Sequence, residues 1–158
     1  MELHVKTFDE LTLDELYDLL RLRVDVFVVE QNCPYPELDG RDKAALHVFL
    51  TDEGGIQACL RVLDRGVASE HAALGRVIAR RRGVGLGRRI VEAGIAAARE
   101  RFGAETIYLE AQCYARGFYE KLGFRPASAE FLEDGIPHVR MLLEAGSDES
   151  INKEAKRG

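Results

Sequence analysis

The sequence predicts one α+β domain, residues 1–145, with a mixed and mostly antiparallel sheet, followed by a polar tail, residues 146–158. Residues 44–51 and 56–63 have the composition of strands, and Asp52-Glu53-Gly54-Gly55 between them is a strong hairpin signal. Two longer segments repeat their apolar residues with the helical period of 3.6. No internal repeat or linker divides the chain, so one domain is expected.

The helices and remaining strands follow from local signals. Thr12-Leu13-Asp14-Glu15 is a capping-box pattern that opens a first helix, whose apolar positions continue to near Glu30. A second helix is expected from Leu86 to Phe102. Gly123 is placed to end a third, short helix as its C′ residue. That short helix is expected at residues 114–122, and the other strands at residues 3–8, 73–79, 106–110, 124–131 and 136–143.

Composition excludes several classes of protein. The chain is 46% hydrophobic and 31% charged, as in soluble globular proteins, and its net charge of −5 lacks the basic field that nucleic-acid binding needs. No apolar run is long enough to cross a membrane. Cys33, Cys59 and Cys113 form no C-x-x-C pair, so they are interpreted as free thiols and not as metal ligands. With no apolar leader at its start, the chain is expected in the cytoplasm, without a metal site.

Residues 80–89 contain three glycines at alternate positions, flanked by arginines, between an apolar strand segment and a predicted helix. Glycines allow close approach of the backbone to a ligand, and a helix start offers unpaired N–H groups, so the segment is suited to phosphate. Counted from Gly83, a dinucleotide fingerprint would require glycine at Arg88, and no Walker Lys-Ser/Thr follows the loop. An arginine-rich surface turn is the alternative.

The spacing Arg82-x-x-Gly85-x-Gly87 resembles the pyrophosphate loop of the GNAT superfamily of N-acetyltransferases. Downstream, residues 112–124 resemble the family segment N-x-x-A-x-x-F-Y-x-x-x-G-F, with Gln112 in place of asparagine. Residues 26–34, 74–77 and 133–138 are similar to the ElaA-like branch. The resemblance covers about residues 20–143, with a shortened join at residues 79–82. It implies the GNAT fold, with about six to seven strands and about four helices.

The resemblance implies an acetyl-CoA-dependent N-acetyltransferase that transfers the acetyl group directly to an amine of a small molecule or peptide. In the family a strand splays from its neighbour after a bulge and leaves backbone groups free for the pantetheine arm. Here those groups would belong to residues 77–79 on one side and 110–111 on the other. The residues expected to contact the cofactor are Val77, Ile78, Ala79, Arg82, Gly83, Val84, Gly85, Leu86, Gly87, Arg88 and Tyr119.

The same resemblance makes Tyr119 the proton donor. A phenol with a pKa of about 10 is protonated at pH 7 and could supply a proton to the departing thiolate. The alternative role for Tyr119 is that of a core residue beside Phe118 and Phe124. The general base is left open among four residues, of which His138 lies in a strand expected to line the acceptor cleft: Glu30, His47, Glu110 and His138.

The acceptor pocket is expected to be shaped by residues 31–42. Glu37, Asp39 and Asp42 in this segment suggest a cationic, amine-bearing acceptor. A sheet-edge homodimer is left open, as is a second function, a non-catalytic acyl-CoA-binding or regulatory module on the same fold. Arg80, Arg81 and Arg89 are left open between solvated side chains and contacts to a 3′-phosphate.

Overall fold

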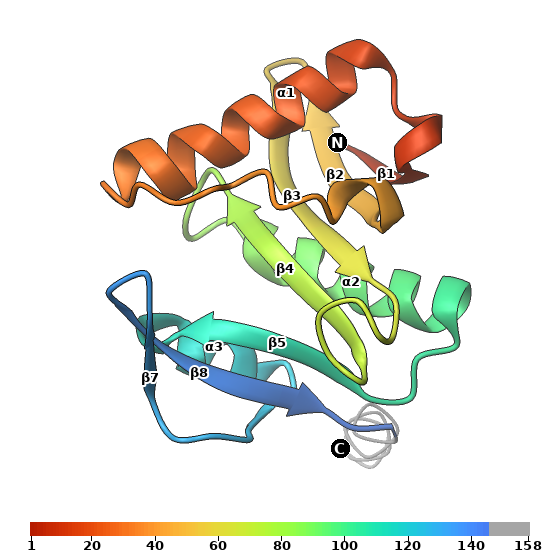
Figure 1. Ribbon diagram of the computed structural model, residues 1–158. Helices are drawn as coiled ribbons and strands as arrows, with labels where there is room; N and C mark the ends of the chain where they lie inside the picture. The colour runs from red at the N-terminus through yellow and green to blue at the C-terminus, as the bar shows by residue number, and fades with distance from the viewer. Residues whose placement is uncertain (146–158) are drawn as a thin grey trace.

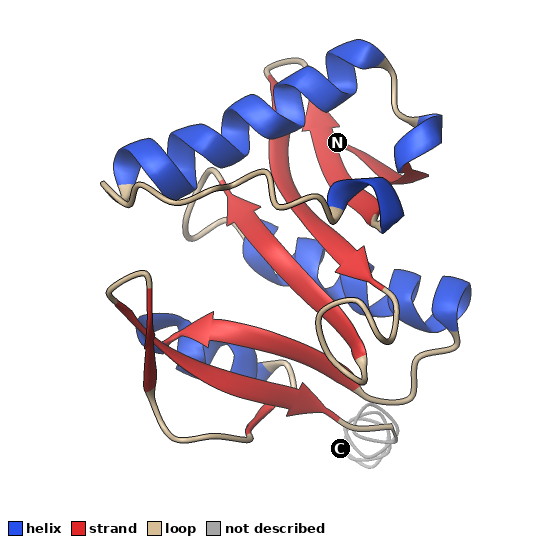
Figure 2. Ribbon diagram, in the orientation of Figure 1, coloured by secondary structure: helices blue, strands red, loops and turns tan. Residues whose placement is uncertain are grey.

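The computed structural model describes residues 1–145, and the predicted tail lies outside the described residues. One sheet forms the centre, with helix α1 on one face and helices α2 and α3 on the other (Figures 1 and 2). Its strands are β1 (Glu2–Thr7), β2 (Leu46–Asp52), β3 (Gly55–Leu63), β4 (Ala72–Ala79), β5 (Ile107–Gln112), β6 (Arg125–Pro126), β7 (Phe131–Glu133) and β8 (Ile136–Leu143). The helices are α1 (Leu13–Val24), α2 (Leu86–Phe102) and α3 (Arg116–Lys121).

The strand order is β1-β2-β3-β4-β5-β8-β6, with β7 paired to β8. Only β4 and β5 pair in parallel, so the prediction of a mixed and mostly antiparallel sheet is confirmed for the described residues. The expected counts were slightly wrong, because the described chain has eight strands and three α-helices. None of these helices has the length and apolar character that a membrane span requires.

The local signals at the two long helices are confirmed. The Thr12 side chain accepts a hydrogen bond from Glu15 N, and the Glu15 carboxylate accepts one from Thr12 N, so the capping box is complete. The first helix ends earlier than its apolar period suggested, and residues 25–30 continue as a π-helical turn. Helix α2 has the predicted bounds.

The strand expected at residues 124–131 is split into β6 and β7. Pro126 has no N–H to donate to a ladder, which confines it to a strand end or edge. Beyond it, the Ser128 hydroxyl accepts the Arg140 N–H that a backbone carbonyl would otherwise take, at 3.0 Å. A side chain has therefore replaced the ladder hydrogen bond, and the chain leaves the sheet until β7.

Helix α2 packs closely on β3 because it carries a glycine at the contact. A Cβ built on Gly94 would lie 2.7 Å from Leu60 Cδ2, so only glycine permits this helix-to-sheet distance without moving Leu60. Ile90 and Val91 on the same helix are completely buried in the main core. This packing fixes the N-terminus of α2 just beyond the end of β4.

Strands β4 and β5 pair over only two residues. The register joins Ala72 to Ile107 and Ala73 to Tyr108, and beyond these pairs the strands diverge (Figure 1). On its other edge β4 pairs with β3, with a register shift opposite Leu60. Arg76 lies within this bulge at φ = +55°, a left-handed conformation that is strained for a residue with a side chain. The bulge and the short pairing create an opening in the sheet.

Candidate active site

A cleft of about 1060 Å³ occupies the opening between β4 and β5. Residues 73–79 of β4 line one side and residues 108–112 of β5 line the other. Residues 133–138 of the β7–β8 hairpin and parts of the segment 30–41 complete its walls. The cleft is therefore formed by both strands of the opening and by the segment after α1.

The edge of β4 that faces the cleft carries no strand beyond Ala73 in the described part of the chain. Val77, Ile78 and Ala79, the residues expected to meet the pantetheine arm, all lie on this stretch and line the cleft. Because β3 still pairs with Ile78 and Ala79 on the opposite edge, the strand stays extended while one edge remains open. Free backbone groups on an extended strand can hydrogen-bond an amide-bearing chain laid beside them.

The glycine-rich loop leads directly into α2. Gly83 and Gly85 have φ of +77° and +78°, and Gly85 is the N-cap of the helix. The first intrahelical bond shown at this end runs from Arg89 N to Gly85 O at 3.1 Å. The N–H groups of Leu86, Gly87 and Arg88 precede it and have no intrahelical acceptor, as at any helix N-terminus. Such a terminus, with left-handed glycines before it, fits a pyrophosphate group.

The loop also touches the helix that carries Tyr119. A Cβ on Gly87 would lie 3.3 Å from Phe118 Cζ, so the glycine lets the start of α2 pack on the Phe118 ring. Phe118 and Tyr119 are neighbours in α3, with ring centroids 5.0 Å apart. The predicted phosphate loop and the predicted donor are therefore held together by direct packing.

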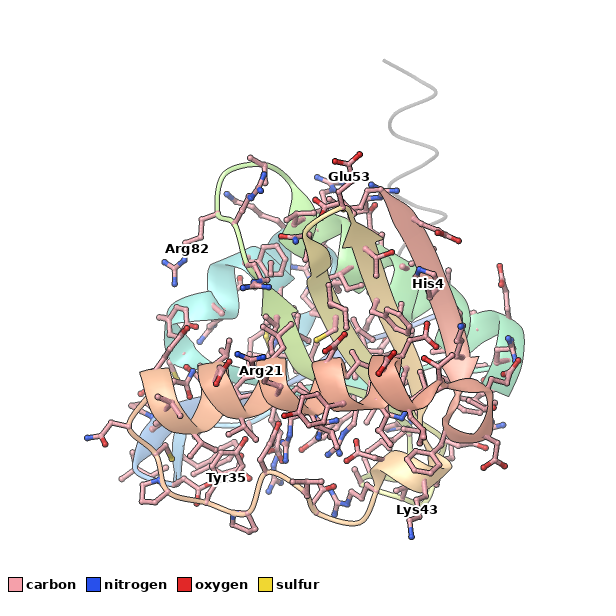
Figure 3. All side chains as sticks on the ribbon, turned by 90° about the horizontal axis from the view of Figure 1, so that it is seen from above. His4, Arg21, Tyr35, Lys43, Glu53 and Arg82 are labelled. Atoms are coloured by element: carbon pink, nitrogen blue, oxygen red, sulfur yellow. The ribbon has the colours of Figure 1, made fainter. Side chains whose placement is uncertain are left out.

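The arginines of the loop have different environments. Arg82 lines the cleft, and its side chain extends away from the ribbon into solvent (Figure 3). The exposed Arg88 guanidinium pairs with Glu92 at 2.8 Å. Arg80 donates from its backbone N–H to Gln57 O at 2.9 Å, which extends the β3–β4 pairing past Ala79.

Tyr119 is a core residue and a cleft residue at once. It is 8% exposed, lines the cleft, and packs edge-on against Phe124 with ring centroids 5.9 Å apart. Its hydroxyl has no hydrogen-bond partner among residues 1–145. Burial, together with the nearby Tyr114, raises the pKa of Tyr119 to about 12. The phenol is therefore protonated at neutral pH and its hydroxyl is available to a ligand.

The proton-donor role of Tyr119 stays a prediction, and the raised pKa bears on how complete the proton transfer would be. Full proton transfer to a thiolate whose conjugate acid has a pKa of ~8.5 would be uphill by roughly 3 to 4 pKa units. The Tyr119 hydroxyl is better suited to donate a hydrogen bond to negative charge that develops on sulfur.

The structure separates the four candidate bases. His47 is buried outside the cleft, its Nε2 lies 2.9 Å from Asp42 O, and burial lowers its pKa. Glu30, Glu110 and His138 all line the cleft. His138 Nδ1 lies 2.7 Å from Ile136 O, which can only accept, so in the neutral ring Nε2 carries the lone pair. His47 is therefore removed from the candidates.

Residues of the segment 31–42 line the cleft, but its three carboxylates are paired with arginines of the protein. Arg23 contacts Glu37 at 3.0 Å and Asp42 at 2.7 Å, and these three side chains are at most 10% exposed. Arg61 binds Asp39 and Asp42 as well. Burial alone would raise the pKa of Asp39, but hydrogen bonds from Arg61 and from Arg41 N hold it well below its usual range. The three carboxylates are neutralised within the protein.

Arg76 adds the third cation of this network. From the β4 bulge it contacts the Glu37 carboxylate, donates to Glu37 O at 3.2 Å, and lies over the Tyr35 ring at 5.4 Å. Tyr35 in turn donates from its hydroxyl to Glu37 Oε2 at 2.7 Å. The segment after α1 is thus anchored to the β4 bulge through Glu37 and Tyr35.

Gln112, the departure from the family segment, has a partner across the cleft. Its Nε2 donates to Gln31 Oε1 at 3.3 Å, which joins the end of β5 to the segment after α1. Glu133 is a cleft residue that was not expected. The sequence feature that could have indicated its position is the Asp134-Gly135 turn. This turn pairs Glu133 with Ile136 and so places Glu133 beside β8.

Comparison with known proteins supports the same assignment. The model of the acetyltransferase (GNAT) domain matches residues 19–145. A UPF0039 protein of Mycobacterium tuberculosis is 44% identical over 133 residues, covering 80% of this chain and 83% of that protein. ElaA of Escherichia coli is 36% identical over 139 residues, covering 85% and 91%.

Two solved structures are similar to this fold. The crystal structure of Escherichia coli ElaA has a TM-score of 0.84 at 34% identity, and that of an acyl-CoA N-acyltransferase from Pseudomonas aeruginosa has 0.84 at 37%. Each comparison covers 90% of this chain and 99% of the other. These similarities support an acyltransferase activity. The chain belongs to the GNAT acetyltransferase family, in its ElaA-like branch.

Proposed function

We propose that the protein is an N-acetyltransferase that uses acetyl-CoA and transfers the acetyl group directly to an amine of a small molecule or peptide. The observation that carries this proposal is the open edge of β4, which runs between the glycine-rich loop and Tyr119. A helix start suited to phosphate, an open strand edge and a free phenol hydroxyl would match the pyrophosphate, the pantetheine arm and the thioester sulfur of an acyl-CoA. The similar Pseudomonas aeruginosa protein is named for an acyl-CoA donor, the same chemical class.

Each part of the site has a defined role in this proposal. The N–H groups at residues 83–88 would hold the pyrophosphate, and the open edge at residues 77–79 would hydrogen-bond the pantetheine amides. The Tyr119 hydroxyl would stabilise the departing sulfur. The cleft walls from residues 30–41 and 133–138 would receive the amine. Binding both substrates in one cleft brings the nitrogen to the thioester without a covalent enzyme intermediate.

Acetyl-CoA is expected to bind the purified protein and raise its melting temperature. A ligand at 100 times its Kd stabilises the folded state by about 2.7 kcal/mol, a shift that thermal denaturation detects easily. Titration calorimetry gives the Kd, and release of free thiol across a panel of amines measures transfer. The absence of both a thermal shift and binding heat at millimolar acetyl-CoA would contradict the proposal. Tight binding without transfer to any amine would favour the non-catalytic acyl-CoA-binding module.

Gly85→Ala is expected to weaken acetyl-CoA binding about tenfold. A side chain at the left-handed φ of +78° costs roughly 1–2 kcal/mol, and relief of that strain would displace the N–H groups that hold phosphate. Gly103→Ala is the matched control, because Gly103 has φ +60° at the opposite end of α2. Calorimetry should show the loss of affinity only for Gly85→Ala, whereas both variants should lower the melting temperature. Equal affinities in the two variants would contradict a phosphate site at this loop.

A further inference from the structure

The segment that follows α1 reaches across the cleft and contacts two elements on its other side. Gln31 accepts a hydrogen bond from the Gln112 side chain at the end of β5, at 3.3 Å. The Cys33 thiol donates to Asp134 O at 3.6 Å, so the segment also contacts the β7–β8 turn, which lies at the same end of the sheet in Figure 1. The chain after α1 therefore bridges the cleft at two points.

The other end of this segment is fixed to β4. Glu37 is buried, and its carboxylate contacts Arg76 of the β4 bulge and Arg23 of α1. The Tyr35 hydroxyl donates to Glu37 Oε2 at 2.7 Å, and the Arg76 guanidinium lies 5.4 Å from the centre of the Tyr35 ring. Tyr35 lines the cleft and is thus held both at its hydroxyl and on one face of its ring.

These contacts close a ring around one part of the cleft. The ring follows β4 to its pairing with β5, crosses from β5 to β8, and follows β8 to the β7–β8 turn. It then returns through the segment after α1 to the β4 bulge. The residues at its joints, which define the acceptor ring, are in order Arg76, Ala73, Tyr108, Ala111, Val139, Asp134, Cys33 and Glu37.

The proposed donor site leads to the acceptor ring. The pyrophosphate would lie at residues 83–88, and a pantetheine arm that follows β4 from Ala79 to Val77 would extend toward Arg76, which belongs to the ring. The thioester would therefore lie at the opening that the ring surrounds. An acceptor that approaches from the side of the segment after α1 has to pass through the ring to reach it.

The acceptor ring offers no strand edge to a peptide backbone. Pro34 and Pro36 flank Tyr35 and have no N–H, so this part of the segment cannot form a regular ladder with a peptide. Strand β8 is paired with β5 on one edge and with β6 and β7 on the other. In the described chain, the strand edges at the opening belong to β4 and β5, where the pantetheine arm would bind. Peptide recognition by strand addition has no edge left here.

We propose that the acceptor is a small-molecule amine, and that the acceptor ring excludes peptides and proteins. The inference rests on the proposed function and deepens it, because that function leaves both kinds of acceptor open. A small amine can enter while the contact between Cys33 and Asp134 stays intact, whereas a polypeptide would bring its backbone against the ring. Tyr35 is the residue that sets this limit, since its side chain lines the cleft between Cys33 and Glu37.

Acetyl transfer to matched acceptors tests the proposal. The panel contains lysine amide, alanine amide, spermidine and phenethylamine, with decapeptides that present an internal lysine or an N-terminal alanine. For the wild-type protein, kcat/KM of the best small amine should exceed that of every peptide by at least about 30-fold. A smaller difference would overturn the inference and leave the acetyltransferase proposal standing.

Tyr35→Ala is expected to widen the acceptor ring. The ratio of kcat/KM between the best small amine and the best peptide should fall by at least about tenfold, because discrimination by size is lost. The Kd of acetyl-CoA should keep its wild-type value, which shows that the variant folds. Tyr17→Ala removes an exposed ring from α1 and is the matched control, with an unchanged ratio. An unchanged ratio in Tyr35→Ala would contradict the role of Tyr35, since a residue with only a structural role would alter stability and not this ratio.

Thiol alkylation tests whether the ring is closed without using any acceptor. Cys33 in the ring is 8% exposed, Cys59 in the core is 1% exposed, and Cys113 is half-buried outside the ring. Labelling by iodoacetamide is followed by mass spectrometry, and each rate is divided by the rate in the urea-unfolded protein. Cys33 should react at least about tenfold more slowly than Cys113, with Cys59 as the protected reference. Weaker protection of Cys33 would show that the ring opens freely and would overturn the inference.

The outcomes separate this inference from the proposed function. A wild-type protein that binds acetyl-CoA but transfers to no member of the panel would contradict the acetyltransferase proposal, and the inference with it. Efficient transfer to a decapeptide would contradict the inference alone.

Discussion

Tyr119→Phe is expected to lower kcat for acetyl transfer about 100-fold and to leave the Kd of acetyl-CoA unchanged. The substitution removes only the hydroxyl, because the ring packing on Phe118 and Phe124 is retained. Loss of one preorganised hydrogen bond to developing negative charge costs about 10²–10³ in kcat. Steady-state kinetics with a thiol-release assay measures kcat, and calorimetry measures the Kd.

The pH profile adds a second check on Tyr119. Its pKa of about 12 lies above the assay range, so its own ionisation should cause no loss of rate between pH 6 and pH 10. Tyr17→Phe removes an exposed hydroxyl from α1 and serves as the control. A kcat within twofold of the wild type in Tyr119→Phe would show that the tyrosine has only a packing role.

Arg23→Met is expected to destabilise the folded protein by about 3–5 kcal/mol. The Arg23 side chain is 3% exposed and binds Glu37 and Asp42, whose charges would remain buried without their main partner. Removing one member of a buried ion network carries this cost, because Glu37 and Asp42 keep only Arg76 and Arg61 as counterions and water cannot replace the lost partner. Urea unfolding at pH 7, followed by circular dichroism in the absence of acetyl-CoA, measures the free energy of unfolding.

Arg116→Gln is the control for Arg23→Met, since it breaks an exposed i, i+4 pair with Glu120 and should change the free energy of unfolding by less than about 1 kcal/mol. The buried network also predicts a direction with pH. Because the pKa values of Asp39 and Asp42 are lowered in the folded state, their contribution is present above their unfolded pKa and is lost as pH falls through the folded pKa. A change below about 1 kcal/mol in Arg23→Met would contradict a structural role for the network.

Local signals in the sequence predicted the donor side of the site well. The glycines at 83, 85 and 87 and the apolar period of α2 act over a few residues, and the structure shows a helix start there. The opening between β4 and β5 followed from the family resemblance, and the register confirms it. The helix start depends on backbone conformation within one segment, where sequence patterns are most informative, whereas the opening lies between two strands that are distant in the sequence.

The acceptor side was harder to predict because its electrostatics are set by distant residues. Glu37, Asp39 and Asp42 form an acidic group when counted along the chain, but their partners come from three other elements: Arg23 of α1, Arg61 of β3 and Arg76 of β4. The hydrophobic periodicity of the sequence gives no information about such ion pairs between distant residues. Glu133 was missed as a cleft residue for a similar reason, since it reaches the cleft through the pairing of β7 with β8.

The strained Arg76 in the β4 bulge has a consequence for substrate selectivity. Its backbone lies where β4 departs from regular pairing beside the donor slot, and its side chain ties Tyr35 and Glu37 over the acceptor pocket. Arg76 therefore contributes to the walls of both proposed substrate pockets. A substitution at position 76 would change the shape of both pockets at once. Relatives with a different residue at this position are therefore expected to differ in both acyl-donor and amine-acceptor preference.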